Sequence, residues 1–137
     1  MCAKLRRASR AVSQLYENAL RPTGLRATQF TILQALSIAQ EVTQATLGEI
    51  LAMESTSLTR TLGIMVRRKW VIKARGEDRR VWRIRLSQSG EAELKRATPY
   101  WEKMQARLRE MLGRETWDQL GSLAQSVTVK VAKGENS

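Results

Sequence analysis

The sequence predicts a mainly helical fold that carries one small β-hairpin. Apolar residues recur at the three- and four-residue spacing of a helix over residues 2–20, 88–112 and 115–133. One short segment, residues 81–86, instead alternates apolar and basic side chains, as a half-buried strand does. The 137 residues and the hydrophobic content of 42% are sufficient for one domain with its own core.

The positive charge of the chain is concentrated in its central part. The net charge is +11, and residues 55–86 contain ten Lys or Arg against two carboxylates, which gives +8 in that segment. Charge gathered on one helix and one hairpin indicates a polyanionic partner, for which nucleic acid is the first candidate.

The composition also argues against enzymatic chemistry. The chain has no histidine, which removes His-based triads, most zinc sites and the commonest general base. It has no phosphate-binding glycine loop and no recognisable nucleophile motif. We therefore predict a protein that is not an enzyme, with no catalytic residues, metal or cofactor.

Cysteine content and hydropathy favour a cytoplasmic protein. The single Cys2 cannot form an internal disulfide, which fits a reducing compartment. No apolar run reaches the roughly 20 residues that cross a bilayer, and no signal peptide is visible. We expect no contact with a membrane.

The first third of the chain predicts three helices. Residues 2–20 form the first, which ends at residues 21–24, Arg-Pro-Thr-Gly. It is either a core helix or half of a dimer seam, because a helix at the start of a small chain has little of its own chain to pack on. Residues 25–39 form the second, capped by Thr28, with buried Phe30, Ile32, Leu33 and Leu36. A short third helix opens at Thr43 or Gln44, with its inward residues being Leu47, Ile50 and Leu51.

The next predicted helix begins at Ser55, which can cap it, and runs to about Lys69. Its buried face consists of Leu58, Leu62, Met65 and Val66. The exposed face begins with small hydroxyls and continues with guanidinium groups: Thr56, Arg60, Gly63 and Arg67, flanked by Ser57 and Thr59. A short helix, a tight turn and a longer helix form a helix-turn-helix, whose second helix enters the major groove of DNA. The alternative is a solvated charged helix without a ligand.

The helix-turn-helix is followed by a predicted hairpin, with strands at residues 71–75 and 81–86. This combination is a winged helix, whose wing can place arginine in a minor groove. Arg79 and Arg80 in the connecting loop are the candidates. Asp78 would repel phosphate, so its useful role is to accept hydrogen bonds from Arg80 and fix the direction of that side chain. It can also simply stabilise the loop, and the two roles are compatible.

The string from Asp78 to Gly90, DRRVWRIRLSQSG, resembles the wing signature of the MarR (multiple-antibiotic-resistance regulator) family of transcription factors. That signature has Asp-x-Arg, an aliphatic-x-Leu-Thr/Ser strand end, and Gly after two more residues. Residues 43–47 and 57–60 resemble the two helices of the family's DNA-binding unit, and the resemblance covers nearly the whole chain. Lys69 departs from the pattern, because the family usually has glycine at this helix end, where a left-handed residue suits the turn.

The resemblance implies a DNA-binding lobe over residues 25–90, with dimerisation helices at residues 1–24 and 91–137. A long helix is predicted over residues 88–112, capped by Ser87 and kinked at Pro99. Its apolar stripe consists of Leu94, Ala97, Trp101, Met104, Leu108 and Met111. A last helix follows, and residues 134–137 form a tail. We interpret the Trp and Met side chains of these helices as core.

We therefore predict a homodimeric winged-helix transcriptional repressor that binds an inverted-repeat operator in double-stranded DNA. The residues expected to contact DNA are Ser55, Thr56, Ser57, Thr59, Arg60, Lys73, Arg75, Arg79 and Arg80. The resemblance implies a small aromatic or phenolic effector between the dimer helices and the lobe, for which the candidate residues are Tyr16, Met65 and Trp101. Redox sensing by Cys2 is not favoured, because the chain has no second cysteine. The rival functions are a sequence-indifferent architectural DNA-binding protein and a protein-interaction module.

Overall fold

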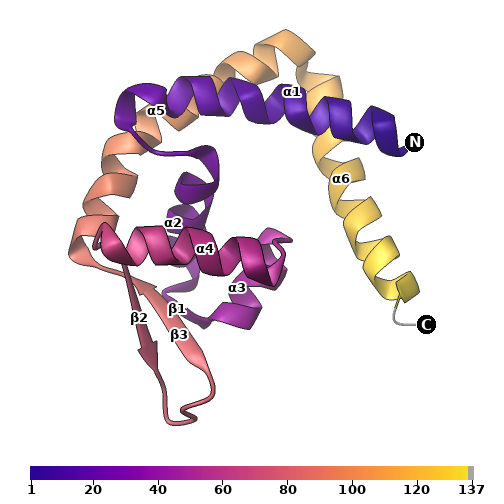
Figure 1. The fold of residues 1–137 in the computed structure, drawn as a ribbon. Coiled ribbons are helices and arrows are strands. Elements are labelled where there is room, and N and C mark those ends of the chain that lie inside the picture. The colour runs from indigo at the N-terminus through magenta and orange to yellow at the C-terminus, as the bar shows by residue number, and fades with distance from the viewer. Residues whose placement is uncertain (136–137) are drawn as a thin grey trace. The chain divides into compact units, whose positions relative to one another are not determined.

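The computed structural model describes residues 1–135 and confirms a mainly helical fold with a small antiparallel sheet (Figure 1). No helix in this range is long and apolar enough to cross a membrane. The elements are α1 (Cys2–Leu20), the 3-10 turn η1 (Arg21–Thr23), α2 (Ala27–Ala39), β1 (Glu41–Thr43), α3 (Gln44–Leu51), α4 (Ser55–Arg67), β2 (Val71–Arg75), β3 (Trp82–Leu86), α5 (Gln88–Leu112) and α6 (Arg114–Glu135).

The chain divides into two compact units, Met1–Trp101 and a second unit from Glu102 onward. The first unit contains the three strands and the helices α1 to α4, together with the first part of α5. The predicted functional division at residues 24 and 90 concerns roles in binding, which this separation does not test.

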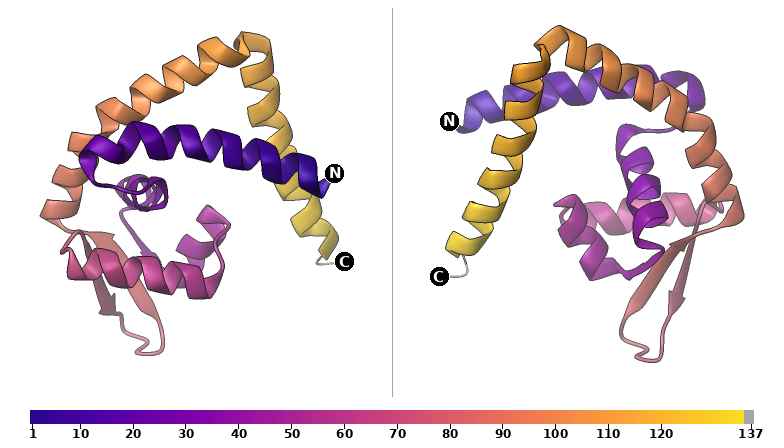
Figure 2. Two further views of the ribbon diagram at one scale, coloured as in Figure 1. Left: turned by 45° about the horizontal axis from the view of Figure 1, so that its top comes forward. Right: turned by 180° about the vertical axis from the view of Figure 1, so that it is seen from behind.

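The core of the first unit is built around α2. Figure 2 shows this helix lying between α1 and α4 in two views. Phe30, Ile32, Leu33 and Leu36 are all buried, as predicted. They pack with side chains from the following elements, among them Leu47, Leu58, Leu62, Met65 and Ile84.

Two residues that were predicted to face inward are exposed. Ile50 in α3 has 54% of its surface exposed, and Val66 in α4 has 37%. In each helix the buried positions follow a narrower stripe than the sequence suggested, and these two residues lie at its flank. The prediction for both was therefore wrong.

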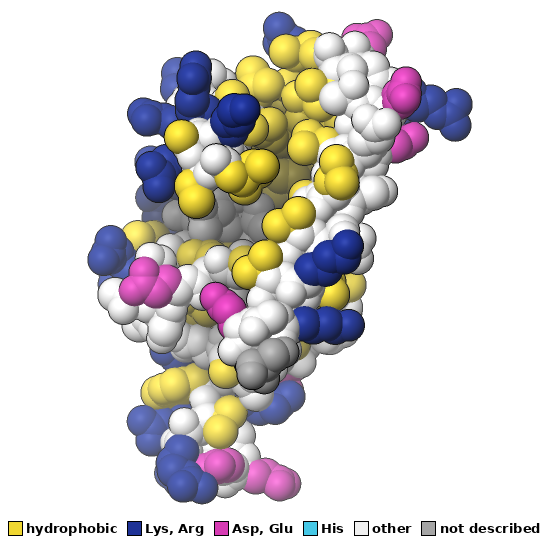
Figure 3. Space-filling model, turned by 90° about the vertical axis from the view of Figure 1, so that its right-hand side faces the viewer, with side chains coloured by type: hydrophobic (Ala, Val, Ile, Leu, Met, Phe, Trp, Pro, Cys, Tyr) yellow, Lys and Arg dark blue, Asp and Glu magenta, His cyan; other side chains and the backbone are white. Residues whose placement is uncertain are grey.

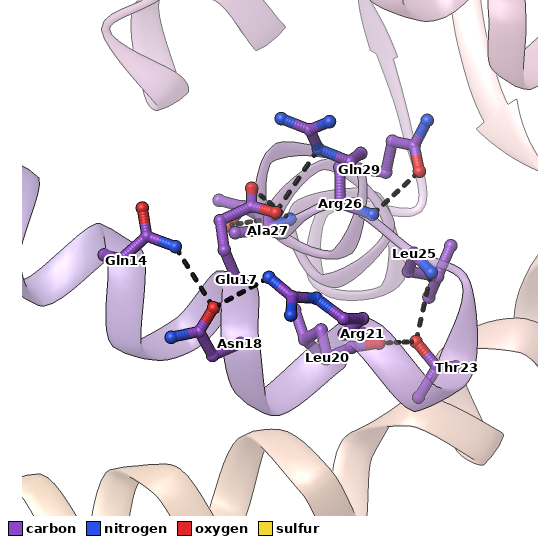
Figure 4. Close-up of polar contacts among 11 residues, drawn as sticks. Gln14, Glu17, Asn18, Leu20, Arg21, Thr23, Leu25, Arg26, Ala27 and Gln29 are labelled. Atoms are coloured by element: carbon purple, nitrogen blue, oxygen red, sulfur yellow. Dashed lines mark hydrogen bonds and ion pairs between the residues drawn. The ribbon is translucent and has the colours of Figure 1, made fainter.

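The start of α2 is capped from α1 (Figure 4). The side chain of Glu17 accepts a hydrogen bond from the backbone N–H of Ala27 at 2.9 Å and pairs with Arg26 at 3.3 Å. The side chain of Gln29 accepts from the N–H of Arg26 at 3.0 Å. Thr28 lies inside the first turn, so its predicted capping role was wrong. The capping acceptor is Glu17, ten residues before Ala27.

The start of α3, expected at Thr43 or Gln44, was predicted correctly, whereas the cap of α4 was not. Thr43 Oγ1 accepts a hydrogen bond from the N–H of Thr46 at 3.1 Å. In α4, Ser55 is the first helical residue, and the N-cap position belongs to Glu54, which makes no side-chain capping bond. The helix also ends at Arg67, two residues before the predicted end.

The sheet contains one strand more than the predicted two-stranded hairpin. The sheet order is β1-β3-β2, and Ile84 in the central strand pairs with Val42 in β1 and with Lys73 in β2. An ion pair of 3.3 Å between Arg83 and Glu41 also joins β3 to β1. With only three residues, β1 is too short to show an alternating pattern, which explains why the sequence did not indicate a strand there.

The last two helices largely follow their predicted bounds. Ser87 Oγ accepts a hydrogen bond from the N–H of Gly90 at 2.9 Å, which confirms the predicted cap of α5. Pro99 lies inside α5, and its kink remains a prediction. Met111 is 60% exposed, unlike the other members of its stripe, because it lies at the last turn of α5. The predicted tail was wrong for Gly134 and Glu135, which are helical, and its other two residues lie outside the described range.

Candidate nucleic-acid interface

The N-terminal half of α4 has an exposed polar face and a buried apolar face. Leu58 and Leu62 are almost fully buried and fix the helix on the core. The residues predicted for DNA contact on this helix are all exposed: Ser55, Thr56, Ser57, Thr59 and Arg60. Such a surface offers hydroxyl and guanidinium donors, which are suited to base edges and phosphates.

Gln44 joins this surface to α3. Its Nε2 donates a hydrogen bond to Thr59 Oγ1 at 2.9 Å, which links the two helices of the helix-turn-helix. Its Oε1 is a buried side-chain oxygen without a hydrogen-bond partner among the residues that the structure describes. The sequence had not marked Gln44 as a site residue, since a polar side chain at a helix start has no distinguishing local signal.

In the wing, two of the basic residues predicted to contact DNA lie over one aromatic ring. Lys73 Nζ is 4.7 Å from the ring centroid of Trp82, and Arg75 Cζ is 4.6 Å from it. The strand register explains this contact, because Arg75 is paired with Trp82 and Lys73 follows on the same face of β2. Trp82 is a residue that sequence reasoning missed, although its place between basic residues in the wing was a possible signal.

The tip of the wing holds the predicted Asp78–Arg80 pair. One carboxylate oxygen of Asp78 accepts from the backbone N–H of Arg80 at 3.0 Å and from its Nε at 3.2 Å. These two hydrogen bonds, the backbone one first, lower the pKa of Asp78 below its usual value. Asp78 is therefore ionised throughout the neutral range. Arg79 is exposed beside it.

A crevice of about 890 Å³ separates the wing from the helix-turn-helix. We call it the α4–wing crevice, and its polar lining includes Gln44, Ser55, Thr59, Lys73 and Arg80. Four of the nine predicted DNA-contact residues line it, while the other five are exposed but do not. Cations and hydroxyl donors gathered around one crevice are suited to a phosphate backbone.

Only two of the three candidate effector-binding residues line the same pocket. Tyr16 and Trp101 stack with ring centroids 4.2 Å apart, and Phe30 stacks on Trp101 at 4.6 Å. Tyr16 and Trp101 line a pocket of about 270 Å³, the aromatic pocket, together with residues that include Glu17 and Met53. Burial raises the pKa of Tyr16, which keeps its phenol protonated. Met65 is fully buried in the core and does not line this pocket.

Residues 1–135 contain no group of three His, Cys, Asp or Glu side chains that could hold a metal ion. Cys2 is exposed at the start of α1.

Residues 23–81 match the sequence profile described as the MarR family. The chain is 36% identical to the transcriptional regulator MosR of M. tuberculosis, whose crystal structure was determined in complex with DNA. That match covers 93% of this chain and 97% of MosR, with a TM-score of 0.76.

More distant structures share the fold. A mutant of E. coli MarR complexed with operator DNA is 22% identical, with a TM-score of 0.82 and 91% of each chain covered. A protein from Pseudomonas aeruginosa, described as a probable transcriptional regulator, is also 22% identical, with a TM-score of 0.82 and coverage of 93% of this chain and 96% of that one. No curated protein matches the chain significantly.

Proposed function

The chain belongs to the MarR family of winged-helix DNA-binding transcriptional regulators, and on that premise we propose that it acts as a homodimeric repressor of an inverted-repeat operator. The observation that carries the proposal is the α4–wing crevice, which gathers helix hydroxyls and wing cations around one opening. The similarity to MosR, which was crystallised with DNA, supports the same partner.

We assign different tasks to the helix and to the wing. The first turns of α4 would enter the major groove, where Arg60 binds a guanine edge and the hydroxyls of Ser55 to Thr59 contact bases or phosphates. Lys73 and Arg75 would contact the backbone. Arg79 and Arg80 would reach the adjacent minor groove, with Asp78 fixing the direction of Arg80.

The second unit supports a homodimer. A segment of about 36 residues is too short to form a stable core of its own. Among its described apolar residues only Met104 and Leu108 are buried, and α6 contains no buried residue at all. Figure 3 shows hydrophobic side chains exposed on the face of the protein that it draws. A second copy, with its own α5 and α6, would cover these side chains, and would place two copies of α4 roughly 34–36 Å apart on DNA.

We propose that a small aromatic or phenolic effector binds the aromatic pocket. The pocket offers stacking surfaces from Tyr16 and Trp101, and the nearby carboxylate of Glu17 favours a neutral phenol over an aromatic acid. Met53, in the turn between α3 and α4, lines both this pocket and the α4–wing crevice. An effector that displaces this turn would therefore change the position of α4 and weaken operator binding.

Selection of bound sequences from random duplex DNA tests the proposal. The selected duplex and a scrambled one are then titrated with the protein at two salt concentrations, with and without a panel of neutral phenols. We expect an inverted repeat that is bound about a thousandfold more tightly than the scramble. Equal affinity for every duplex, with a steep salt dependence, would overturn the proposal in favour of an architectural protein. A repressor also lowers transcription from a promoter that carries the selected sequence, so increased transcription would contradict that part.

A further inference from the structure

We infer that Trp82 is a positioning residue for DNA binding, which holds the cationic groups of Lys73 and Arg75 along the wing before DNA arrives. The inference rests on the proposed function and adds a residue and a role to it. No DNA contact by the indole itself is required.

The strand register places these three side chains on one face of the hairpin. Val71, Lys73 and Arg75 alternate along β2, opposite Leu86, Ile84 and Trp82 of β3 respectively. At one end this face joins the core, where Val71 and Ile84 are buried. Towards the wing tip the same face becomes cationic, and Lys73 and Trp82 line the α4–wing crevice. Lys73 and Trp82 therefore lie on the side of the wing that faces the helix-turn-helix. We call Trp82 together with the cations that it contacts, Lys73 and Arg75, the platform.

Contact with the indole ring of Trp82 restricts the positions of the charged groups of Lys73 and Arg75. Both charged groups lie within 5 Å of the same indole centroid, a distance at which the face of the ring attracts them. Trp82 is 37% exposed, so the indole is open enough to leave the cations accessible to a phosphate. By contrast, Arg83 on the opposite face of β3 is paired with Glu41 and belongs to the sheet rather than to this platform.

The indole already restricts the side chains of Lys73 and Arg75 in the free protein. DNA binding therefore costs less of their conformational entropy. Immobilising a long, flexible side chain at an interface weakens binding several-fold, and two such side chains amount to about a tenfold effect. Loss of the platform should therefore reduce affinity while the charges themselves remain. An exposed indole between basic residues is consistent with this role.

The test compares Trp82→Leu and Trp82→Phe in the full-length protein, alone and combined with Lys73→Ala and Arg75→Ala. We expect Trp82→Leu to weaken binding to the selected operator about tenfold. Trp82→Phe retains a ring, although a weaker one, and should stay within about threefold of the wild type. Because Trp82→Leu keeps both cations, it should retain most of the salt dependence, whereas the double alanine variant should lose up to about 0.9 from the log–log salt slope for each lost phosphate contact.

Non-additivity identifies the role as positioning. In the double alanine background, Trp82→Leu should change operator affinity less than twofold, since nothing remains for the indole to position. In an Arg83→Ala background, used as a matched control on the other face, its effect should be undiminished. Equal losses in all backgrounds would mean that Trp82 contacts DNA or supports the wing fold, and would overturn the inference.

A measurement without DNA separates this inference from the proposed function. The ring current of Trp82 should shift the Lys73 ε-methylene and Arg75 δ-methylene proton resonances upfield in the free protein, and Trp82→Leu should abolish the shift. Unshifted resonances in the wild type would overturn the platform. Shifted resonances in a protein that binds no duplex would leave the contacts established, and would overturn both the proposed function and the DNA-binding role of the platform.

Discussion

Gly90 is a position at which close packing, rather than backbone freedom, requires glycine. A Cβ atom built on it would lie 2.0 Å from the carbonyl oxygen of Trp70, and no side chain can fit at that distance. The backbone N–H of Gly90 also donates to Ser87, which caps α5. The final glycine of the wing string is therefore explained by the contact between the start of α5 and the end of the α4–β2 connection.

We predict that Gly90→Ala lowers the free energy of unfolding by about 3 kcal/mol, because the added methyl group forces the two backbones apart. Urea denaturation followed by circular dichroism measures the change. Gly121→Ala is the matched control, since nothing lies within 4 Å of its Cβ position on α6, and it should stabilise by about 0.5–1 kcal/mol. A Gly90→Ala variant as stable as the wild type would contradict the predicted packing.

Asp78 and Arg80 form an ion pair at the tip of the wing. Although Asp78 is acidic, it can assist the binding of DNA by orienting Arg80. The pair is exposed, with 91% of the Arg80 side chain and 51% of the Asp78 side chain accessible, so it contributes little to stability. Its effect should instead be on the direction of the guanidinium group. Two hydrogen bonds from Arg80 to one carboxylate oxygen fix both the loop backbone and the side chain.

We predict that Arg80→Ala weakens operator binding by about 2 kcal/mol, and that Asp78→Ala weakens it by about 1 kcal/mol. The double variant should lose little more than Arg80→Ala alone, as fluorescence anisotropy titrations would show. Glu77→Ala is the control, because it removes a neighbouring carboxylate that makes no bond to Arg80, and it should leave affinity equal or higher. Stronger binding by Asp78→Ala would mean that phosphate repulsion outweighs orientation.

At the scale of the element, α4 ends in a Schellman motif that is built without glycine. The N–H of Lys69 donates to the carbonyl of Val66 at 2.9 Å, and the N–H of Trp70 donates to that of Met65 at 3.0 Å. Lys69 adopts the left-handed conformation, with φ of 64°. The buried pair of Met65 and Trp70 accompanies the motif and explains why the turn forms despite the strain on Lys69.

We predict that Lys69→Gly raises the free energy of unfolding by about 0.5–1 kcal/mol, because it relieves a left-handed conformation that costs an L-residue about 1–2 kcal/mol. Lys69→Ala removes the same charge without relieving the strain, and it should not stabilise. Thermal unfolding of the two variants separates backbone strain from charge. Equal stability of both variants would assign any gain to reduced charge repulsion.

At the scale of the whole molecule, the exposed apolar residues of α6 determine whether a second chain is needed. Leu120, Leu123, Val127 and Val131 are 45–63% exposed and fall on one face of the helix. Val129, which is 45% exposed, lies on the opposite face. If the stripe is the dimer seam, these two faces should differ in their tolerance of charge.

We predict that Leu123→Lys combined with Val127→Lys weakens dimerisation at least about a hundredfold, since each substitution loses about 1.5–3 kcal/mol of apolar burial. Operator affinity should fall with it, because one chain supplies only half of a two-fold site. Val129→Lys is the matched control and should remain dimeric. Sedimentation equilibrium across the micromolar range measures both, and dissociation of the control alone would place the seam on the other face.

Features with a local cause could be predicted from the sequence. Helical periodicity predicted α1 and α5 with the observed bounds, and alternation in residues 81–86 predicted β3. Ser87 was identifiable as a cap because a hydroxyl just before a helix can accept a hydrogen bond from the backbone N–H three residues later, as it does from Gly90. The polar first turns of α4 and the wing cations were also visible, since side-chain chemistry at a given spacing depends on nearby residues.

Features that join distant residues could be identified only from the folded structure. The cap that Glu17 provides for α2, the pairing of the three-residue strand β1, and the close approach of Gly90 to Trp70 all join residues ten or more positions apart. The position of Trp82 beside Lys73 and Arg75 depends on the strand register, which sequence alternation constrains only to one face. Each contact depends on where the folded chain brings its parts together, and no pattern within one segment contains that information.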